Sequence, residues 1–205
     1  MLTYNRLEMA KAAIECFLSQ TYENKELVIV NSGSELYRKN LQTFIDYQKS
    51  DKIKHVLRNK RHGETVGDLR NCSLNNATGD YLCTWDDDDL FSRQRIESQV
   101  FFLEKYNADY CMFKNFIIRL HNGDKYAVNY EKGFEPSILY KKPKFLYPSL
   151  NKHEDSYFIA EFQKNFNEIL VDNDFNDYIY CSNKDNISGE QHFLGIIKRH
   201  KSKKL

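Results

Sequence analysis

Apolar residues in the first 106 positions alternate between two spacings, and this alternation restricts the fold more than any other feature. Short apolar runs that predict buried strands cover residues 26–30, 53–57 and 81–85. Apolar residues at helical spacing predict helices over Leu7–Gln20, Glu35–Gln48, Thr65–Asn76 and a segment that Ser92 caps. Strands that alternate with helices indicate βαβ units, so we predict an α/β fold with a mixed, mainly parallel central sheet flanked by helices.

The second half of the chain has a different pattern. Phe158, Phe162 and Phe166 follow one another at four-residue spacing, which predicts a helix over His153–Phe166. Strands of a more antiparallel kind are predicted at residues 110–120, 127–130, 136–142 and 177–182. We therefore divide the chain into residues 1–106, residues 107–197 and a basic tail at 198–205, with the first two forming a single domain.

Composition excludes several classes of protein. The 205 residues are 41% hydrophobic and 29% charged, which is typical of a soluble globular domain. A net charge of +1 argues against a general nucleic-acid binder. The five cysteines never occur in C-x-x-C spacing, which indicates reduced thiols in a cytoplasmic protein without a zinc site. The beginning of the chain lacks a signal-peptide pattern, and no apolar run approaches the length of a membrane span.

The last eight residues concentrate positive charge. They contain the basic residues Lys198, Arg199, Lys201, Lys203 and Lys204. A solvated, frayed terminus is the favoured interpretation of such a run. The alternative is a contact with an anionic membrane surface.

Four consecutive aspartates, Asp86 to Asp89, follow the strand predicted at residues 81–85. On an extended backbone Asp86 and Asp88 point to one side and Asp87 to the other. Two carboxylates on one side form a hard-oxygen site for Mg²⁺ or Mn²⁺, which also takes phosphate oxygens from a substrate. A bound cation would offset the repulsion among these carboxylates. The alternative is an acidic turn that caps the next helix.

Other candidate residues are weaker when each is considered alone. Arg70 suits phosphate binding, but a surface helix arginine is the commoner case. Glu154 and Asp155 lie where a helix is predicted to start, and acidic residues favour that position through the helix dipole. Either can also act as a general base near a reacting hydroxyl. His192 follows a turn-rich stretch, and a lone histidine is more often structural than a ligand.

Taken together, several segments resemble the family 2 glycosyltransferases, which have the GT-A fold. The resemblance covers nearly the whole chain and preserves the order of the family's motifs. The matching segments are "TYNRLE", "SQTYENKELVIVNSGSE", "LRNCSLNNATGDYLCTWDDDDL" with its D-x-D, "HEDSYF" with its E-D, and "YIYCSNKDNISGEQHF".

The resemblance implies a role for each candidate residue. Arg70 would approach the diphosphate or the base. Asp155 would be the catalytic base, and Glu154 would contact the acceptor or the donor sugar. The nucleotide-sugar would also contact Thr3, Tyr4, Asn5, Asn31 or Ser32, Asp86 and Asp87, while Asp88 and His192 would bind the metal or complete its site.

The implied function is metal-dependent, inverting transfer of a sugar from a nucleoside-diphosphate sugar, with UDP favoured, to a glycan or lipid-linked hydroxyl. The metal would be Mn²⁺ or Mg²⁺. Residues 1–106 would bind the nucleotide and residues 107–197 the acceptor. The protein would be cytoplasmic, with peripheral membrane contact through the tail as the alternative noted above. The oligomeric state stays open.

Two departures from the family keep other functions open. Asn31-Ser32 replaces an acidic residue that the family usually has, and only Met1 and Leu2 remain of the family's first strand. That strand is therefore either truncated or reduced to a stub. A non-catalytic nucleotide- or glycan-binding module, or an inactive truncated transferase, is the main alternative. A metal-dependent phosphohydrolase ranks third, because such enzymes usually place their aspartates at the first strand.

Overall fold

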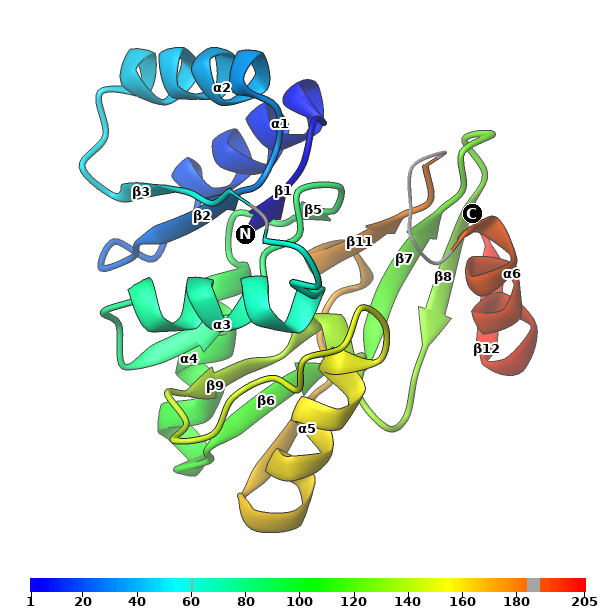
Figure 1. The fold of residues 1–205 in the computed structure, drawn as a ribbon. Coiled ribbons are helices and arrows are strands. Elements are labelled where there is room, and N and C mark those ends of the chain that lie inside the picture. Colours follow the sequence, from blue (N-terminus) through cyan, green and yellow to red (C-terminus); the bar gives the residue numbers. More distant parts are fainter. Residues whose placement is uncertain (60, 184–188) are drawn as a thin grey trace.

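The computed structural model describes residues 1–59, 61–183 and 189–205, and it has the mixed α/β architecture that the sequence predicts (Figure 1). The first half contains β1 (Leu2–Thr3), α1 (Leu7–Leu18), β2 (Leu27–Asn31), α2 (Glu35–Gln48), β3 (Ile53–Leu57), α3 (Val66–Asn76), β4 (Tyr81–Cys83), β5 (Leu90–Phe91) and α4 (Arg95–Tyr106). The alternation of strands and helices is thus confirmed, with α2 and β3 at the predicted residues.

The second half supplies the remaining elements. They are β6 (Tyr110–Phe113), β7 (Asn115–Arg119), β8 (Lys125–Asn129), the short η1 (Glu135–Ser137), β9 (Leu139–Lys141), α5 (Glu154–Asn165), β10 (Glu168–Val171), η2 (Phe175–Asp177), β11 (Tyr178–Cys181), α6 (Gly189–Arg199) and β12 (Lys201–Lys204). The strands β10 and β12, the helix α6 and the short helices η1 and η2 were not predicted. The expected strand at residues 110–120 is two strands, β6 and β7, which belong to different sheets.

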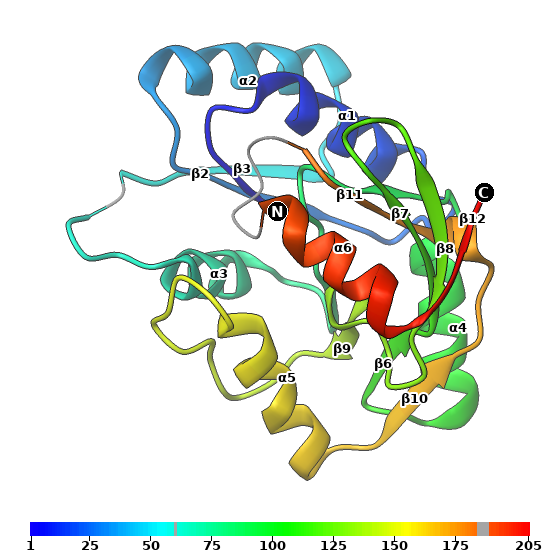
Figure 2. The same cartoon turned by 90° about the vertical axis from the view of Figure 1, so that its right-hand side faces the viewer.

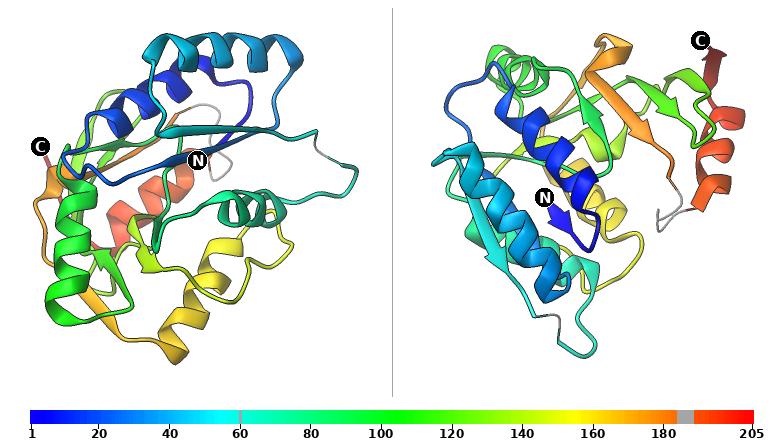
Figure 3. Two further views of the ribbon diagram at one scale, coloured as in Figure 1. Left: turned by 90° about the vertical axis from the view of Figure 1, so that its left-hand side faces the viewer. Right: turned by 90° about the horizontal axis from the view of Figure 1, so that it is seen from above.

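The strands of the described residues form three hydrogen-bonded sheets. The first has the order β1-β2-β3 and is wholly parallel. The second, β10-β6-β9-β4, and the third, β12-β8-β7-β11-β5, are mainly antiparallel. Helices α1 and α2 cover one face of the first sheet and α3 lies on the other (Figure 3). Parallel pairs also occur in the second half, between β10 and β6 and between β11 and β7, but most of its pairs are antiparallel, so the more antiparallel second half is confirmed.

Ser92 does not cap α4 as expected. The helix begins after Gln94, which makes no side-chain cap hydrogen bond. The Ser92 hydroxyl instead donates to Asp177 Oδ1 at 2.7 Å, and its backbone N–H donates to the Asp177 carbonyl. Since β5 separates the aspartates from α4, the alternative of an acidic cap on that helix does not apply either.

The basic tail is not frayed, contrary to the favoured expectation. Residues Lys201–Lys204 form β12, which pairs antiparallel with β8 (Figure 2). Lys204 Nζ also lies 2.9 Å from Asp124 Oδ2 at the adjoining turn. Backbone pairing explains the order, because a strand edge can hold a segment whose side chains are all exposed.

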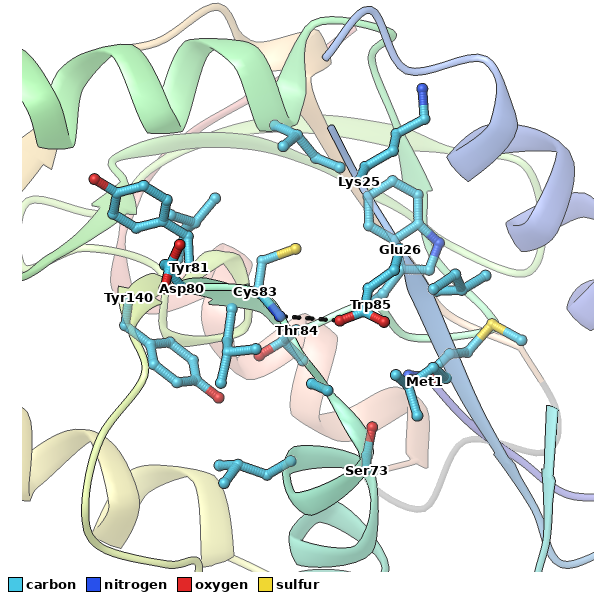
Figure 4. A pocket seen from close by; sticks show the side chains of 18 of the residues that line it. Met1, Lys25, Glu26, Ser73, Asp80, Tyr81, Cys83, Thr84, Trp85 and Tyr140 are labelled. Atoms are coloured by element: carbon cyan, nitrogen blue, oxygen red, sulfur yellow. Dashed lines mark hydrogen bonds between the residues drawn. The ribbon is translucent and has the colours of Figure 1, made fainter. Parts of the chain in front are cut away.

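The first strand in the structure, β1, has only two residues. Leu2 and Thr3 pair with Val30 and Asn31, at the carboxyl end of β2. Beside the other end of β2 lies a cavity of about 480 Å³, with Met1, Glu26, Cys83 and Tyr140 among its lining residues (Figure 4). This cavity separates the first sheet from β4, so the two are not joined through hydrogen bonds.

The start of α3 lies close to the segment that leads into α5. The Gly67 N–H donates to the Leu150 carbonyl at 3.0 Å, and a Cβ on Gly67 would lie 1.9 Å from the Pro148 carbonyl oxygen. Asn71 fixes the same segment through hydrogen bonds to the Tyr147 backbone N–H and carbonyl. A side chain at Gly67 would therefore push away the backbone that positions Glu154 and Asp155.

We predict that Gly67→Ala lowers the free energy of unfolding by about 1–3 kcal/mol, as overpacking against backbone does. Urea denaturation measures this change. Gly195→Ala is the matched control, because its new Cβ meets only the flexible end of Arg199, at 3.6 Å. Removing a helix-interior glycine should raise stability slightly. Equal stabilities for Gly67→Ala and wild type would contradict the close contact.

Candidate active site

A cleft of about 800 Å³ opens where the first and second halves of the chain meet. Its walls come from the turn after β4, from α3, from the start of α5, and from β11 and α6. It brings together seven of the candidate residues, which are Arg70, Asp86, Asp87, Asp88, Glu154, Asp155 and His192. Residues up to 122 positions apart in the sequence thus face one space, as the ordered motifs imply.

The aspartates do not alternate as an extended backbone requires. Asp87 and Asp88 lie in a turn, and both contact the same arginine, Arg6. Arg6 Nη1 donates to Asp88 Oδ2 at 2.8 Å, while Nη2 donates to Asp87 Oδ1. Burial raises the pKa of Asp87 to about 6, and the Arg6 charge opposes that rise.

Asp89 has a structural position at the end of the turn. Its carboxylate is almost fully buried, accepts from the Tyr178 hydroxyl at 2.7 Å, and accepts from the Cys181 N–H at 2.9 Å. Burial raises its pKa well above the ordinary value. These hydrogen bonds attach the aspartate turn to β11.

Arg70 connects the aspartates to α5. Its Nε donates to Glu154 Oε1 at 3.0 Å, and its Nη1 lies 3.8 Å from Asp86 Oδ1. Burial raises the pKa of Asp86, and Arg70 is the main group that opposes this rise. Arg70 therefore keeps two carboxylates from different halves of the chain close together.

Glu154 and Asp155 differ in exposure. Glu154 is buried, while Asp155 is half-buried and accepts the backbone N–H of Ser156 at 2.8 Å. His153 precedes them with a φ of 64°, in the left-handed region, so the chain turns sharply into α5. Both residues line the cleft, and Asp155 is the more exposed of the two.

The predicted base-pocket residues do not line this cleft. Tyr4 is 60% exposed and Thr3 is buried against the Tyr37 hydroxyl. Asn5, in the turn after β1, and Ser32, directly after β2, join these two segments: Asn5 Oδ1 accepts from the Ser34 N–H, and the Ser32 N–H donates to the Thr3 carbonyl.

Asn31, the alternative to Ser32 as a predicted contact of the nucleotide-sugar, has its side chain inside the fold. The residue is fully buried, and its Oδ1 accepts the Gly33 N–H at 3.0 Å. Its amide nitrogen lies 3.0 Å from His55 Nε2, and His55 Nδ1 lies 2.7 Å from Gln42 Oε1. This chain of hydrogen bonds needs a neutral His55 that carries its proton on Nδ1. Asn31 thus has a structural position behind the site.

Comparison with known proteins identifies the family. The model of "Glycosyl transferase family 2" matches residues 1–170. The chain belongs to this family. It is 30% identical over 154 residues to the putative glycosyltransferase EpsE of Bacillus subtilis, which covers 75% of this chain and 55% of EpsE. An uncharacterized glycosyltransferase of Rickettsia bellii is 33% identical over 104 residues, or 51% of this chain and 14% of that protein.

Solved structures confirm the GT-A fold. The S. aureus TarS fragment 1–349 in complex with UDP-GlcNAc matches with a TM-score of 0.72 at 17% identity, over 90% of this chain and 58% of TarS 1–349. The mannosyltransferase PcManGT from Pyrobaculum calidifontis, in complex with GDP-Man and Mn²⁺, gives a TM-score of 0.69 at 14% identity, over 90% of this chain and 56% of that chain. The family 2 chain thus spans less than two thirds of these structures and of the curated relatives above.

The donor set of this family 2 chain suits a hard cation only in part. Among residues 1–59, 61–183 and 189–205, no three His, Cys, Asp or Glu residues group as a metal site. His192 Nε2 lies 3.4 Å from the Tyr180 hydroxyl, and burial lowers its pKa. Carboxylates of the aspartate turn nevertheless fit Mg²⁺ or Mn²⁺, which often bind one or two carboxylates and the phosphates of a substrate. The residues fit a site that a diphosphate completes.

Sequence reasoning missed Arg6, although it lies within the "TYNRLE" segment. Its backbone occupies the N-cap position of α1, where its side chain makes no cap and extends to the aspartates instead. A basic residue at the end of the first strand was the available signal. Its partners lie more than 80 positions away, so local patterns did not reveal the contact.

We predict that His55 makes the stability of the fold depend on pH. Burial, with help from Arg38, lowers its pKa, so folding favours the neutral ring. The stabilisation from the neutral His55 ring is fully present above a pH of about 6.5, the pKa of histidine in the unfolded chain. It is lost as the pH falls through the lower pKa that His55 has in the folded protein. The melting temperature of wild type should therefore fall relative to that of His55→Gln between pH 7 and pH 5. If the melting temperatures of wild type and His55→Gln changed equally with pH, the hydrogen bonds described for His55 would be contradicted.

Proposed function

We propose that this chain is a metal-dependent, inverting glycosyltransferase that uses a nucleoside-diphosphate sugar, preferably a UDP-sugar. The observation behind the proposal is that one cleft joins the aspartate turn, Arg70 and the half-buried Asp155. Acidic groups that hold a cation and a separate carboxylate that accepts a proton are the two parts this reaction needs.

In the proposed reaction the donor's diphosphate lies beside Asp88 and Arg70, and the acceptor hydroxyl approaches Asp155. Asp155 removes the hydroxyl proton while the acceptor oxygen attacks the anomeric carbon. The bond to the diphosphate breaks on the opposite face, which inverts the configuration. Arg70 stabilises the charge that develops on the leaving group. A divalent cation held by Asp88 would supply further positive charge at that oxygen.

Glu154 positions Arg70 in this scheme. It is buried and paired with the guanidinium at 3.0 Å, so it has little access to a substrate. The half-buried carboxylate of Asp155 has more access to the cleft and is the better proton acceptor. We therefore assign the base role to Asp155 and an orienting role to Glu154.

Names of related proteins favour UDP as the carrier. TarS was solved with UDP and with UDP-GlcNAc. The Escherichia coli relative WfaP, 30% identical over 56% of this chain and 46% of WfaP, is named as a UDP-Glc:α-D-GlcNAc-diphosphoundecaprenol glucosyltransferase. By analogy we propose a glycan or lipid-linked acceptor. The GDP-Man complex of PcManGT makes a guanosine donor the alternative to test.

We predict that Mn²⁺ supports release of nucleoside diphosphate from one member of a panel of nucleotide-sugars, and that chelator abolishes it. Asp88→Asn should lose this release, and Asp155→Asn should lower it about 10²- to 10⁴-fold, the usual contribution of a general base. Asp155→Asn should still bind UDP, because only the proton acceptor has changed. Asp51→Asn, at an exposed site, is the matched control.

Two results would favour the alternatives. Binding of UDP without release from any donor, and without any effect of Asp155→Asn, indicates a binding module or an inactive transferase. Hydrolysis of simple phosphoesters as readily as of nucleotide-sugars indicates a phosphohydrolase.

We further propose that the tail helps the protein reach a lipid-linked acceptor at an anionic membrane surface. Among the described helices none is long and apolar enough to cross a bilayer. The Lys201 side chain is 85% exposed, and Lys198 and Lys203 are exposed nearby. Because β12 is held by backbone pairing, these lysines extend from an ordered surface.

We predict that Lys198→Gln/Lys201→Gln/Lys203→Gln sediments less with phosphatidylserine vesicles than wild type does. Each basic residue near such a surface contributes about 1 kcal/mol, so binding should weaken roughly tenfold or more. The control Lys39→Gln/Lys105→Gln/Lys164→Gln removes the same charge from other exposed sites. If the tail variant and the control variant sedimented equally with the vesicles, the proposed membrane contact of the tail would be contradicted.

A further inference from the structure

The feature that the proposed reaction leaves unexplained is the position of Arg6. Its guanidinium spans two neighbouring carboxylates, with Nη1 2.8 Å from Asp88 Oδ2 and Nη2 bonded to Asp87 Oδ1. The side chain is 24% exposed, whereas those of Asp87 and Asp88 are 1% and 14% exposed. Arg6 therefore lies between a buried anionic turn and the open cleft that it also lines.

Arg6 and a divalent cation both need Asp88. An arginine that donates through two nitrogens to two carboxylates is held more firmly than a single-point contact. A dication bound to the same Asp88 carboxylate would lie close to the guanidinium, and like charges at such short range repel strongly. Metal binding at Asp88 is therefore opposed as long as Arg6 stays in place.

The Arg6 side chain can move into the cleft that it lines. The backbone before it turns at Asn5, with a φ of 53°, and the side chain is free of any capping role at α1. Its exposed side faces the cleft, where a diphosphate would offer oxygens that suit a guanidinium. Moving from Asp88 to a phosphate would keep Arg6 paired while removing its positive charge from the Asp88 carboxylate, whose Oδ2 also accepts from Asn183 Nδ2 at 3.3 Å.

We propose that Arg6 is a built-in counter-ion that a divalent cation must displace from Asp88, and that the diphosphate of the nucleotide is its alternative partner. Metal and nucleotide then bind cooperatively, because each removes a cost from the binding of the other. Arg6 is a positioning residue in this account. The displacement by metal stands independently, while the role of the diphosphate rests on the function proposed above.

The test measures Mn²⁺ affinity by EPR titration without nucleotide. Arg6→Met alone leaves the buried Asp87 uncompensated and makes the site more negative, so it is not a sufficient comparison. Arg6→Met/Asp87→Asn removes one positive and one negative charge, and the isosteric asparagine keeps the turn filled. Arg93→Met, at an exposed arginine that contacts Ser19 and not the aspartates, is the control.

We expect the double variant to bind Mn²⁺ about fivefold or more tightly than wild type, at the lower end of typical coupling between sites. Arg93→Met should match wild type. Equal or weaker Mn²⁺ binding by the double variant, in a chain with a wild-type circular dichroism spectrum, would overturn the displacement.

A second arm repeats the titration with saturating UDP. In wild type UDP should increase Mn²⁺ affinity by a larger factor than in the double variant, since only wild type has Arg6 to transfer. An equal increase in both proteins would overturn the role of the diphosphate. If calorimetry shows that UDP does not bind at all, the proposed function fails, while the comparison without nucleotide still decides whether Arg6 competes with the metal.

Discussion

The site depends on the pairing of its crowded carboxylates with two arginines from distant parts of the chain. Arg6 compensates Asp87 and Asp88, and Arg70 compensates Asp86 and Glu154. Without these partners the buried carboxylates would have to take up protons or move into solvent. The same contacts join α1 and α3 to the turn after β4 and to the start of α5. Charge compensation therefore also sets the shape of the cleft.

Adjacent aspartates have different positions because each faces a different environment. Asp89 faces the interior and attaches the turn to β11 through Tyr178 and Cys181. Asp87 is buried against Arg6, while Asp88 reaches the same arginine from a more open position. Asp86 faces Arg70. A run of identical residues thus combines an anchor, Asp89, with three carboxylates that line the cleft, and their arginine partners explain how so much charge lies beside the core.

Local patterns predicted the parts of the fold that local physics determines. The apolar faces of α2 and α5 recur at helical spacing, and β2 is a continuous buried apolar run, so all three could be predicted from local sequence. Helix α6 was not predicted because only Phe193 and Ile196 form its buried face and because glycines, which disfavour helices, stand at positions 189 and 195. Strand β12 has only exposed side chains, so its order depends on pairing with β8, which no local period reveals.

The candidate site shows the same division between local and distant information. The family's motifs brought Arg70, Asp86, Asp88 and Asp155 into one predicted site, and the structure places all four on one cleft. What the motifs did not reveal is which charges neutralise one another, since the Arg6–Asp88 contact joins positions 82 residues apart. Because an arginine already pairs with the aspartate turn, we propose that the affinity of this site for a cation depends on the position of Arg6 as well as on the carboxylates. On this proposal, a count of acidic residues alone would overestimate how tightly the site binds metal.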